Sequence, residues 1–295
     1  MKADNPKQDF SLLGDLTELY VKRWQKNPVG WLCNALGVAY ARFAFAWSRG
    51  TTQLASPDPR FPPFWHEFQA SYYYDSDCAE KLQGRYPEHH TWDGAWYPNN
   101  NSELEIWKIL APYIQSTLFP LIEKFSDEKF KPNCPVLHYR AGDVPFDRSV
   151  FYRFARYDFY DWCMEQVPER RWLIVTDLKA MMATPAQVAA SSRYLDDLRL
   201  YLDSKGIETF IMEQRSPFDD LYTMIHAPYL MASIFTSFAY FAGLAKPEGN
   251  YVVAHSPKTR VDVPWMCKAP SLPHEEVADY LDTAAVLRQL RGEYQ

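Results

Sequence analysis

The sequence predicts an α/β fold in which helices cover a parallel β-sheet. The first observation is that short apolar segments alternate with longer amphipathic segments from residue 134 onward. This alternation is typical of strand–helix–strand units, whose strands run parallel. The second observation is that polar residues directly follow three of the apolar segments. Ligands of such folds bind beyond the carboxyl ends of the strands, so these residues are the candidates for a functional site.

The individual elements of the C-terminal half follow from the apolar pattern and from the residues that flank it. Strands are expected at 134–139, 171–177, 207–212, 233–236 and 250–255. Helices are expected at 149–167, 191–206, 216–232 and 237–245. A last amphipathic segment, 275–294, predicts a terminal helix that packs back onto this half.

The N-terminal half is predicted to be less regular. The apolar segment 31–47 predicts a helix that Gly50 ends, and a second helix is expected at 102–125. Residues 51–101, which are rich in Pro, Tyr, Trp and Asn, are expected to form mostly loop. The polar segment 126–133 is the expected domain boundary, which divides the chain into 1–128 and 129–295.

The second N-terminal helix carries conflicting signals. Ser102 and Glu105 have the spacing of a capping box, which favours a helix that starts at this point. Pro112 and Pro120 lie further along the same segment and are expected to break or kink the helix.

Composition excludes some functional classes. The net charge is −6 and the pI is about 5.7, which argues against nucleic acid as the main partner because phosphate binding needs a basic surface. The N-terminus has no apolar signal segment, and Asn34 and Arg42 interrupt the most apolar segment, so no stable membrane insertion is expected. The five cysteines are scattered and include no CxxC pair, which suits a reducing compartment. A cytoplasmic protein is therefore expected.

The end of the first predicted C-terminal strand carries His138, Arg140, Gly142 and Asp143. Arginine has a permanent planar charge that can bind a phosphate through two hydrogen bonds. Gly142 would allow a tight turn, and Asp143 could orient Arg140 or accept a proton from a hydroxyl nucleophile. The alternative is an Arg–Asp pair that only fixes a loop, with His138 as an ordinary core residue.

Two further strand ends carry polar residues. Thr176 and Asp177 end one strand, and Thr236 and Ser237 stand where a short strand leads into a helix. Hydroxyl groups and free backbone N–H groups at a helix N-terminus form an anion site, although a simple N-cap is the alternative. Together with Arg140, these residues suggest a diphosphate ligand. Neither a GxGxxG nor a GxxxxGK[ST] motif is present, so dinucleotide and P-loop chemistry are not supported.

Four segments resemble motifs of one family. The segment "HYRAGD" resembles the HxRxGD signature of the α1,2-, α1,6- and O-fucosyltransferase superfamily. "DDLYTMIHAPYLMASIFTSFAYFAGL" resembles the later motif of these enzymes, and "IVTDL" stands where they have a strand that ends in Ser-Asp or Thr-Asp. "VGWLCNALGVAYA" is similar to their first loop and helix; it keeps Gly30 and Asn34 but lacks the second glycine. The segments occur in the family's order.

The resemblance implies a GT-B fold, in which two Rossmann-like domains face a cleft. Residues 1–128 would form the acceptor-side domain, and residues 129–295 would bind the nucleotide sugar. The resemblance further implies transfer that needs no metal and inverts the anomeric carbon, with no cofactor other than the donor substrate.

By motif position, each candidate residue has an implied role. Arg140 would hold the donor β-phosphate, while His138 and Asp143 would shape the surrounding loop. The other donor-site residues would be Gly30, Asn34, Asp177, Thr236, Ser237 and Phe238. Ala141 stands where the family often has a second basic residue. GDP-fucose is the expected donor, and a UDP-pentose such as UDP-xylose is the alternative.

A glycan hydroxyl is the expected acceptor. Aromatic rings provide flat walls for sugars, so the Trp- and Tyr-rich segment 62–98 is the predicted acceptor surface. The general base would be Asp143 or a residue of this segment. The candidate bases in this segment are Asp75, Asp77, His89, His90 and Asp93, and Trp92 and Trp96 are the candidate stacking walls for the acceptor.

Two alternative functions stay open. Asp75-Ser76-Asp77 resembles the DxD motif of metal-dependent GT-A glycosyltransferases, in which paired carboxylates bind Mn²⁺ or Mg²⁺ at the donor diphosphate. The other alternative is a protein that binds a sugar or a nucleotide without catalysing transfer.

Overall fold

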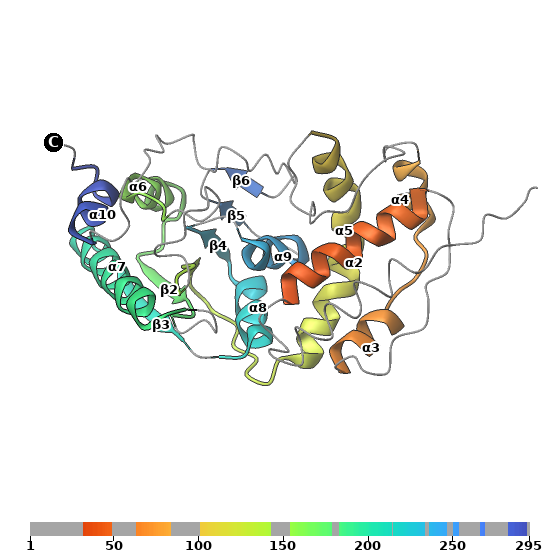
Figure 1. The fold of residues 1–295 in the computed structure, drawn as a ribbon, viewed down its shortest axis with the longest axis horizontal. Helices are drawn as coiled ribbons and strands as arrows, with labels where there is room; N and C mark the ends of the chain where they lie inside the picture. Colours follow the sequence, from red (N-terminus) through yellow and green to blue (C-terminus); the bar gives the residue numbers. More distant parts are fainter. Residues whose placement is uncertain are drawn as a thin grey trace, which may run out of the picture.

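The computed structural model confirms an α/β fold with a parallel sheet (Figure 1). It describes residues 32–48, 63–83, 101–142, 154–178, 183–213, 215–233, 236–246, 250–253, 266–268 and 283–293. Six strands lie within these ranges, in the order β3-β2-β1-β4-β5-β6, and all neighbours pair in parallel. This is the strand order of a Rossmann-type sheet, in which the direction of winding reverses between β1 and β4.

Most of the predicted strands are confirmed. The strands are β1 (Val136–His138), β2 (Arg171–Val175), β3 (Glu208–Met212), β4 (Tyr229–Ala232), β5 (Asn250–Val253) and β6 (Met266–Lys268). Four of them lie at the expected positions, whereas β6 was not predicted.

The fourth strand lies earlier in the chain than predicted. The expected helix at 216–232 is confirmed over α8 (Pro217–His226) but ends earlier than predicted, and Tyr229–Ala232 form β4. The expected strand at 233–236 lies partly outside the described residues. Ala227 has an extended backbone with φ −62° and ψ 138°. It precedes Pro228, and a residue before proline avoids the helical conformation. The following apolar residues are thereby free to pair with β1 and β5.

Three helices cover one face of the sheet. These are α6 (Tyr157–Gln166), α7 (Pro185–Ser204) and α10 (Thr283–Leu290). They form one hydrophobic cluster with Leu137, Ile174 and Met231 of the strands. The prediction that the terminal helix packs back is confirmed, because Val286 and Leu290 of α10 belong to this cluster.

Helix α7 starts earlier than the sequence pattern suggested. Thr184 and Gln187 form a capping box, and Pro185 occupies the first helical position. Proline suits this position because the backbone N–H that it lacks would have no partner in the helix.

The opposite face of the sheet is covered by α8 and α9 (Ser237–Ala245), and beyond them by the N-terminal helices. These N-terminal helices are α2 (Leu32–Ser48), α3 (Pro63–Ala70), α4 (Ser76–Leu82) and α5 (Asn101–Phe125). Tyr40 of α2 stacks on Phe241 of α9 with ring centroids 6.0 Å apart. Gln115 of α5 donates a hydrogen bond of 2.6 Å to the carbonyl of Lys246, directly after α9.

The described part of the N-terminal half contains helices but no strand. Residues 32–48, 63–83 and 101–125 therefore supply no second Rossmann-like sheet. Instead, α2 to α5 share a single hydrophobic cluster with Val136, Leu173 and Leu230 of the sheet. The helices on the right of Figure 1 and the sheet thus form one core.

Two expectations about this half are corrected within the described residues. Helices α3 and α4 lie within 63–83, where loop was expected, because apolar residues such as Phe64 and Phe68 recur at helical spacing and are buried. The expected break of helix α5 is wrong, because the helix continues through Pro112 and Pro120, and a kink at these residues stays a prediction. Both prolines lie on the exposed side of the helix, where water can hydrate the carbonyl groups that proline leaves without a partner.

Candidate functional site

The candidate site lies at the carboxyl ends of β1 and β4. These strands are neighbours in the sheet, and the winding direction reverses between them. Crevices at such reversal points are where ligands bind in doubly wound sheets. Helices α8 and α9 both begin at this edge, because each follows a strand of the parallel sheet.

Side-chain alternation places the predicted residues on one face of the sheet. Val136 of β1 and Val175 of β2 both pack into the cluster beneath α8 and α9. Successive side chains of a strand point to opposite faces, so His138, the last residue of β1, lies on this same face. The ring of His138 lies 5.6 Å from that of Phe238 in α9. The structure therefore brings the first and the third predicted strand ends together.

His138 is a buried, neutral imidazole. It is the last residue of β1 and is 6% exposed. Burial, together with the nearby charge of Arg140, lowers the pKa of His138 to about 3. Among the described residues, its Nδ1 atom has no hydrogen-bond partner. His138 thus carries a buried ring nitrogen without a described partner rather than a positive charge.

The main chain of this strand end is fixed by its neighbours. The backbone N–H and the hydroxyl of Ser233 both donate to the carbonyl of His138 at 3.2 Å. Gly142 has φ 68°, a left-handed conformation that glycine adopts without strain, as the sequence predicted. Arg140 is partly exposed between these two anchored positions. Asp143 lies outside the described residues, so its role as a base or as a partner of Arg140 stays a prediction.

The second strand end combines a structural residue with a candidate site residue. Thr176 is buried, and its hydroxyl donates to the carbonyl of Tyr139 at 2.8 Å. Thr176 therefore ties the end of β2 to the end of β1. Asp177 is exposed, and its charge contributes to raising the pKa of Asp220 in α8.

The N-terminus of α9 shows the N-cap that the sequence left open as the alternative, and the anion site stays a prediction. Thr236 is the N-cap, and its hydroxyl accepts a hydrogen bond of 3.1 Å from the N–H of Ala239. Ser237 and Phe238 follow it and are half-buried. The first turn contains no acidic residue, so the positive end of the helix dipole is not neutralised by the helix itself.

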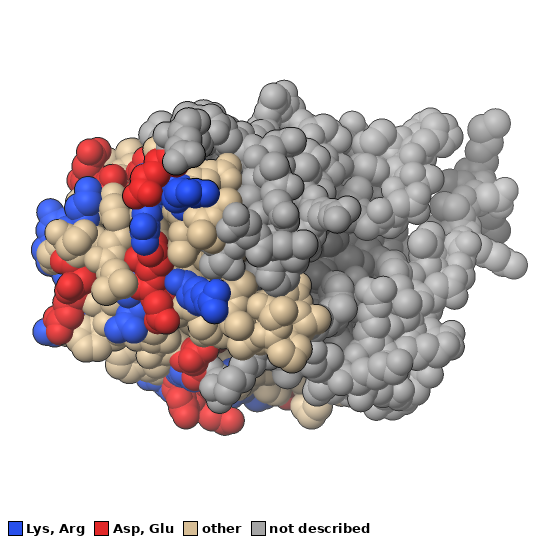
Figure 2. Space-filling view, turned by 60° about the vertical axis from the view of Figure 1, so that its left-hand side comes forward, with Lys and Arg blue, Asp and Glu red and all other residues tan. Residues whose placement is uncertain are grey.

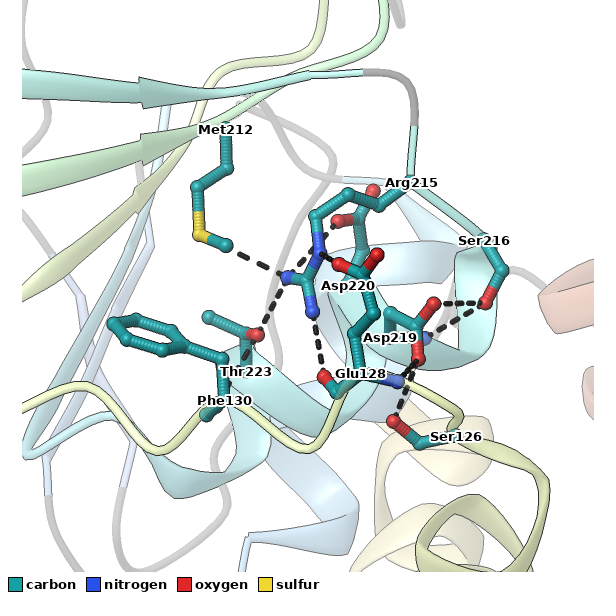
Figure 3. Close-up of polar contacts among 9 residues, drawn as sticks. All are labelled: Ser126, Glu128, Phe130, Met212, Arg215, Ser216, Asp219, Asp220 and Thr223. Atoms are coloured by element: carbon teal, nitrogen blue, oxygen red, sulfur yellow. Dashed lines mark hydrogen bonds and ion pairs between the residues drawn. The ribbon is translucent and has the colours of Figure 1, made fainter.

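Residues at the start of α8 form a polar cluster that the sequence analysis did not single out (Figure 3). Its best-satisfied member is Asp219, which accepts hydrogen bonds from the hydroxyls of Ser126 and Ser216 and from the N–H of Glu128, at 2.7 to 2.8 Å. Burial acts to raise the pKa of Asp219, but these hydrogen bonds and the charge of Arg215 bring it below its ordinary value. Asp219 is therefore a stable, ionised anchor.

Asp220, the next residue, has an opposite character. It is 8% exposed, and its Oδ1 atom lies 3.7 Å from Nη1 of Arg215 without a hydrogen-bond partner in the described part of the chain. Burial raises the pKa of Asp220 to about 7, although Arg215 acts against this rise. The signal for this cluster was present in "RSPFDD", where a Ser-Pro pair caps a helix that has an acidic first turn.

Two of the acceptor residues predicted in the N-terminal half, Asp75 and Asp77, lie on helix α4 and not at this edge. Asp75 is the N-cap of α4 and accepts a hydrogen bond of 2.9 Å from the N–H of Cys78, and Asp77 is exposed in the next turn. Helix α4 packs against α2 and α5, on the side away from the sheet (Figure 1). The cap accounts for Asp75 without a bound metal. In the described residues, no three or more His, Cys, Asp or Glu side chains gather as a metal site.

Several predicted residues cannot be placed at the site. Asn34 lies on the backbone of α2, and its side chain is outside what the structure describes. The others fall outside the described ranges: Gly30, His89, His90, Trp92, Asp93 and Trp96.

The charged residues on the face around α6, α7 and α10 are of both signs (Figure 2). Lys205 pairs with Asp161 at 3.0 Å, and Arg171 pairs with Glu208 at 3.0 Å. Basic and acidic side chains alternate over the coloured part of this face, so it has no broad basic surface for nucleic acid. In addition, none of the described helices has the length and apolar composition needed to span a membrane.

Comparison with known proteins identifies no family for this chain. No protein-family model, no curated protein and no solved structure matches it. A functional proposal therefore rests on the residues at the carboxyl edge of the sheet.

Proposed function

We propose that the edge formed by β1 and β4 binds the diphosphate of a nucleotide sugar, and that the protein is a glycosyltransferase. The observation that carries this proposal is the convergence of Arg140 and the N-terminus of α9 at neighbouring strand ends. An arginine side chain, which is always charged, and a helix N-terminus both bind phosphate groups.

The chemistry of glycosyl transfer suits this arrangement. The bond between the anomeric carbon and the diphosphate oxygen breaks as the acceptor hydroxyl oxygen forms its bond from the opposite side. Negative charge then builds on the departing diphosphate, and Arg140 and the N–H groups of α9 stabilise it. The hydroxyl proton passes to a base, for which Asp143 is the sequence-based candidate. Because His138 is neutral, its imidazole can hydrogen-bond the donor, while Arg140 supplies the positive charge for the diphosphate.

The finer parts of the proposal come from the resemblance. It favours GDP-fucose as the donor, with UDP-xylose as the alternative, a glycan hydroxyl as the acceptor, and catalysis without a metal. The described helices of 1–128 pack in the same hydrophobic core as the sheet. We therefore treat these helices and the sheet as one unit that binds the donor. The two-domain GT-B arrangement stays a prediction.

Isothermal titration with GDP, UDP and their sugars tests the binding step. We expect one nucleoside diphosphate to bind, and Arg140→Ala to weaken it about tenfold or more because a charge-assisted phosphate contact is lost. Arg171→Ala is the matched control: Arg171 lies at the amino end of β2, at the opposite edge of the same sheet. Wild-type affinity in Arg140→Ala, or the absence of any nucleotide binding, would contradict the proposal.

Transfer is tested by mass spectrometry of an acceptor glycan library incubated with each donor. We expect a mass increase of one sugar that persists in EDTA. Activity that EDTA abolishes and Mn²⁺ restores would instead favour the metal-dependent interpretation of Asp75 and Asp77. Tight donor binding without any transfer would favour the non-catalytic alternative, and binding of UDP but not GDP would exclude GDP-fucose.

A further inference from the structure

The carboxyl end of β1 is held from both sides by buried hydroxyl groups. Residues 139–142 belong to neither a helix nor a strand, so their buried carbonyl groups need partners outside regular secondary structure. The hydroxyl of Thr176, directly after β2, donates to the carbonyl of Tyr139 at 2.8 Å. The hydroxyl of Ser233, directly after β4, donates to the carbonyl of His138 at 3.2 Å. Each strand that flanks β1 thus supplies one buried hydroxyl to its end.

The two hydroxyl groups are not equivalent. The bond from Thr176 is the shorter one, and its acceptor, Tyr139, directly precedes Arg140. Thr176 is itself held from the other side, because its N–H donates to the carbonyl of Met212 in β3 at 3.2 Å. The carbonyl of His138 also accepts the backbone N–H of Ser233 at 3.2 Å, so it would keep one donor without the Ser233 hydroxyl. Loss of the Thr176 hydroxyl should therefore disturb this strand end more.

The residues on both sides of Arg140 are also fixed by their side chains. Tyr139 and Ala141 are buried and belong to the hydrophobic cluster beneath α6 and α7. The ring of Tyr139 stacks on that of Phe154 with centroids 5.6 Å apart. Arg140 is partly exposed between these two buried neighbours. The direction in which its side chain leaves the protein is therefore set by the main chain of this short segment.

We propose that Thr176 and Ser233 are positioning residues for Arg140, because their hydroxyls fix the main chain before it and so direct its guanidinium toward the diphosphate. A two-bond contact between a guanidinium and a phosphate depends on geometry as well as on charge. A main chain that is fixed before binding raises affinity, since less conformational freedom is lost when the ligand arrives. Neither hydroxyl needs to contact the ligand in this role. The inference rests on the proposed function, because it presumes a diphosphate at Arg140.

The first test is Thr176→Val, since valine has nearly the shape of threonine but lacks the hydroxyl. We expect GDP or UDP, whichever binds the wild type, to bind this variant about fivefold more weakly in isothermal titration. Thr176→Ser keeps the hydroxyl and should restore affinity to near the wild-type value. Ser233→Ala should lose only about twofold, because the N–H of Ser233 still donates to the carbonyl of His138. Wild-type affinity in Thr176→Val would overturn the proposal.

Thr117→Val is the matched control. Thr117 is buried in α5, and its hydroxyl donates to the carbonyl of Tyr113 at 2.7 Å. A purely structural role of Thr176 predicts that both variants melt at a lower temperature and keep wild-type affinity. The proposal predicts that only Thr176→Val loses affinity.

A double-mutant cycle shows whether Thr176 acts through Arg140. In the Arg140→Ala background, Thr176→Val should change the affinity little, because no guanidinium is left to position. An equal loss in both backgrounds would mean that Thr176 affects the ligand by another route, which also overturns the proposal. If Thr176→Val does not fold, Ser233→Ala takes its place in the same cycle.

Hydrogen–deuterium exchange of the ligand-free protein gives a readout that needs no nucleotide. Peptides that contain residues 138–142 should exchange faster in Thr176→Val than in the wild type or in Thr117→Val. An unchanged exchange rate would mean that the hydroxyl does not hold this segment.

The outcomes separate this inference from the proposed function. A wild-type protein that binds neither GDP nor UDP overturns both. Binding that Arg140→Ala weakens and Thr176→Val leaves unchanged supports the proposed function and overturns only the inference about the two hydroxyls.

Discussion

Helices α8 and α9 start at the same edge of the sheet and on the same face, yet their first turns differ. Each is capped by a hydroxyl side chain, Ser216 in α8 and Thr236 in α9, at hydrogen-bond distances of 3.1 Å. Helix α8 has two carboxylates in its first turn, and α9 has none. The positive end of the α8 dipole is therefore met by carboxylates of its own first turn, while the first turn of α9 contains no acidic residue.

This contrast shows that two helices with the same strand–turn–helix geometry can differ in the charge of their first turn. In α8 the carboxylate of Asp219 joins the helix to the segment after α5, because it accepts hydrogen bonds from Ser126 and Glu128. In α9 the neighbouring group is the imidazole of His138, which is neutral.

The largest expected effect is the loss of the Asp219 anchor. Asp219→Asn should lower the free energy of unfolding at neutral pH by about 2–3 kcal/mol, because three donors lose a charged acceptor. The pKa of Asp219 is lowered by folding, so its stabilising effect is present above the ordinary aspartate range and disappears as the pH falls through the lower folded value. Urea denaturation at neutral and strongly acid pH should show a difference that vanishes in acid. An equal difference at both pH values would contradict this.

The next effect comes from giving α9 the first turn of α8. Ser237→Asp should weaken nucleotide binding by about tenfold, equivalent to about 1.4 kcal/mol, because the new carboxylate competes with the phosphate. The melting temperature should not fall, since an acid at a helix N-terminus is favourable. Titration calorimetry and thermal unfolding measure the two effects, with Ser237→Asn as the uncharged control. Unchanged affinity would show that the phosphate does not lie at α9.

A smaller effect of opposite sign is expected at Asp220. Its pKa is raised by folding to about 7, so the protein loses stability as the pH rises from the ordinary aspartate value of about 3.9 toward 7. Asp220→Asn should match the wild type near pH 4 and be more stable above pH 7, by on the order of 1 kcal/mol. Urea denaturation at the two pH values tests this. If Asp220→Asn instead destabilised the protein at neutral pH, the folded protein would be stabilised by the ionised Asp220 carboxylate.

The smallest effect compares the two caps. Thr236→Ala should cost about 1 kcal/mol, as is typical for loss of an N-cap. Ser216→Ala should cost slightly more, because Ser216 also donates to Asp219 at 2.8 Å. Thr236→Ser and Ser216→Thr keep the hydroxyl and serve as controls in thermal unfolding. A larger cost at Thr236 would show that the α8 cluster does not depend on its cap.

Local patterns predicted the fold class and one part of the site. Alternating segments indicated the parallel sheet, and the polar residues after β1 and before α9 marked the edge where His138 and Phe238 meet. Such residues are visible in sequence because polar groups stand out directly after a buried strand.

What local patterns could not show is pairing between distant residues. Arg215 and Glu128 are 87 positions apart, and no local pattern connects them. The uninterrupted apolar segment around β4 gave no periodicity to separate helix from strand, so Pro228 was the only local marker of the boundary. Aromatic residues in α3 were taken for loop because their partners lie in other helices, as when Phe64 meets Phe218 with ring centroids 5.1 Å apart.

The shared core on the α8–α9 face has a consequence for how the chain is made. Helix α2 is synthesised well before Phe241, the residue of α9 on which its Tyr40 stacks. Contacts between residues so far apart along the chain form slowly, and exposed apolar helices invite aggregation in the meantime. We therefore expect the N-terminal helices to depend on chaperones until α9 emerges. A ribosome-bound chain stalled before residue 237 should bind a chaperone holdase, and the full-length chain should release it.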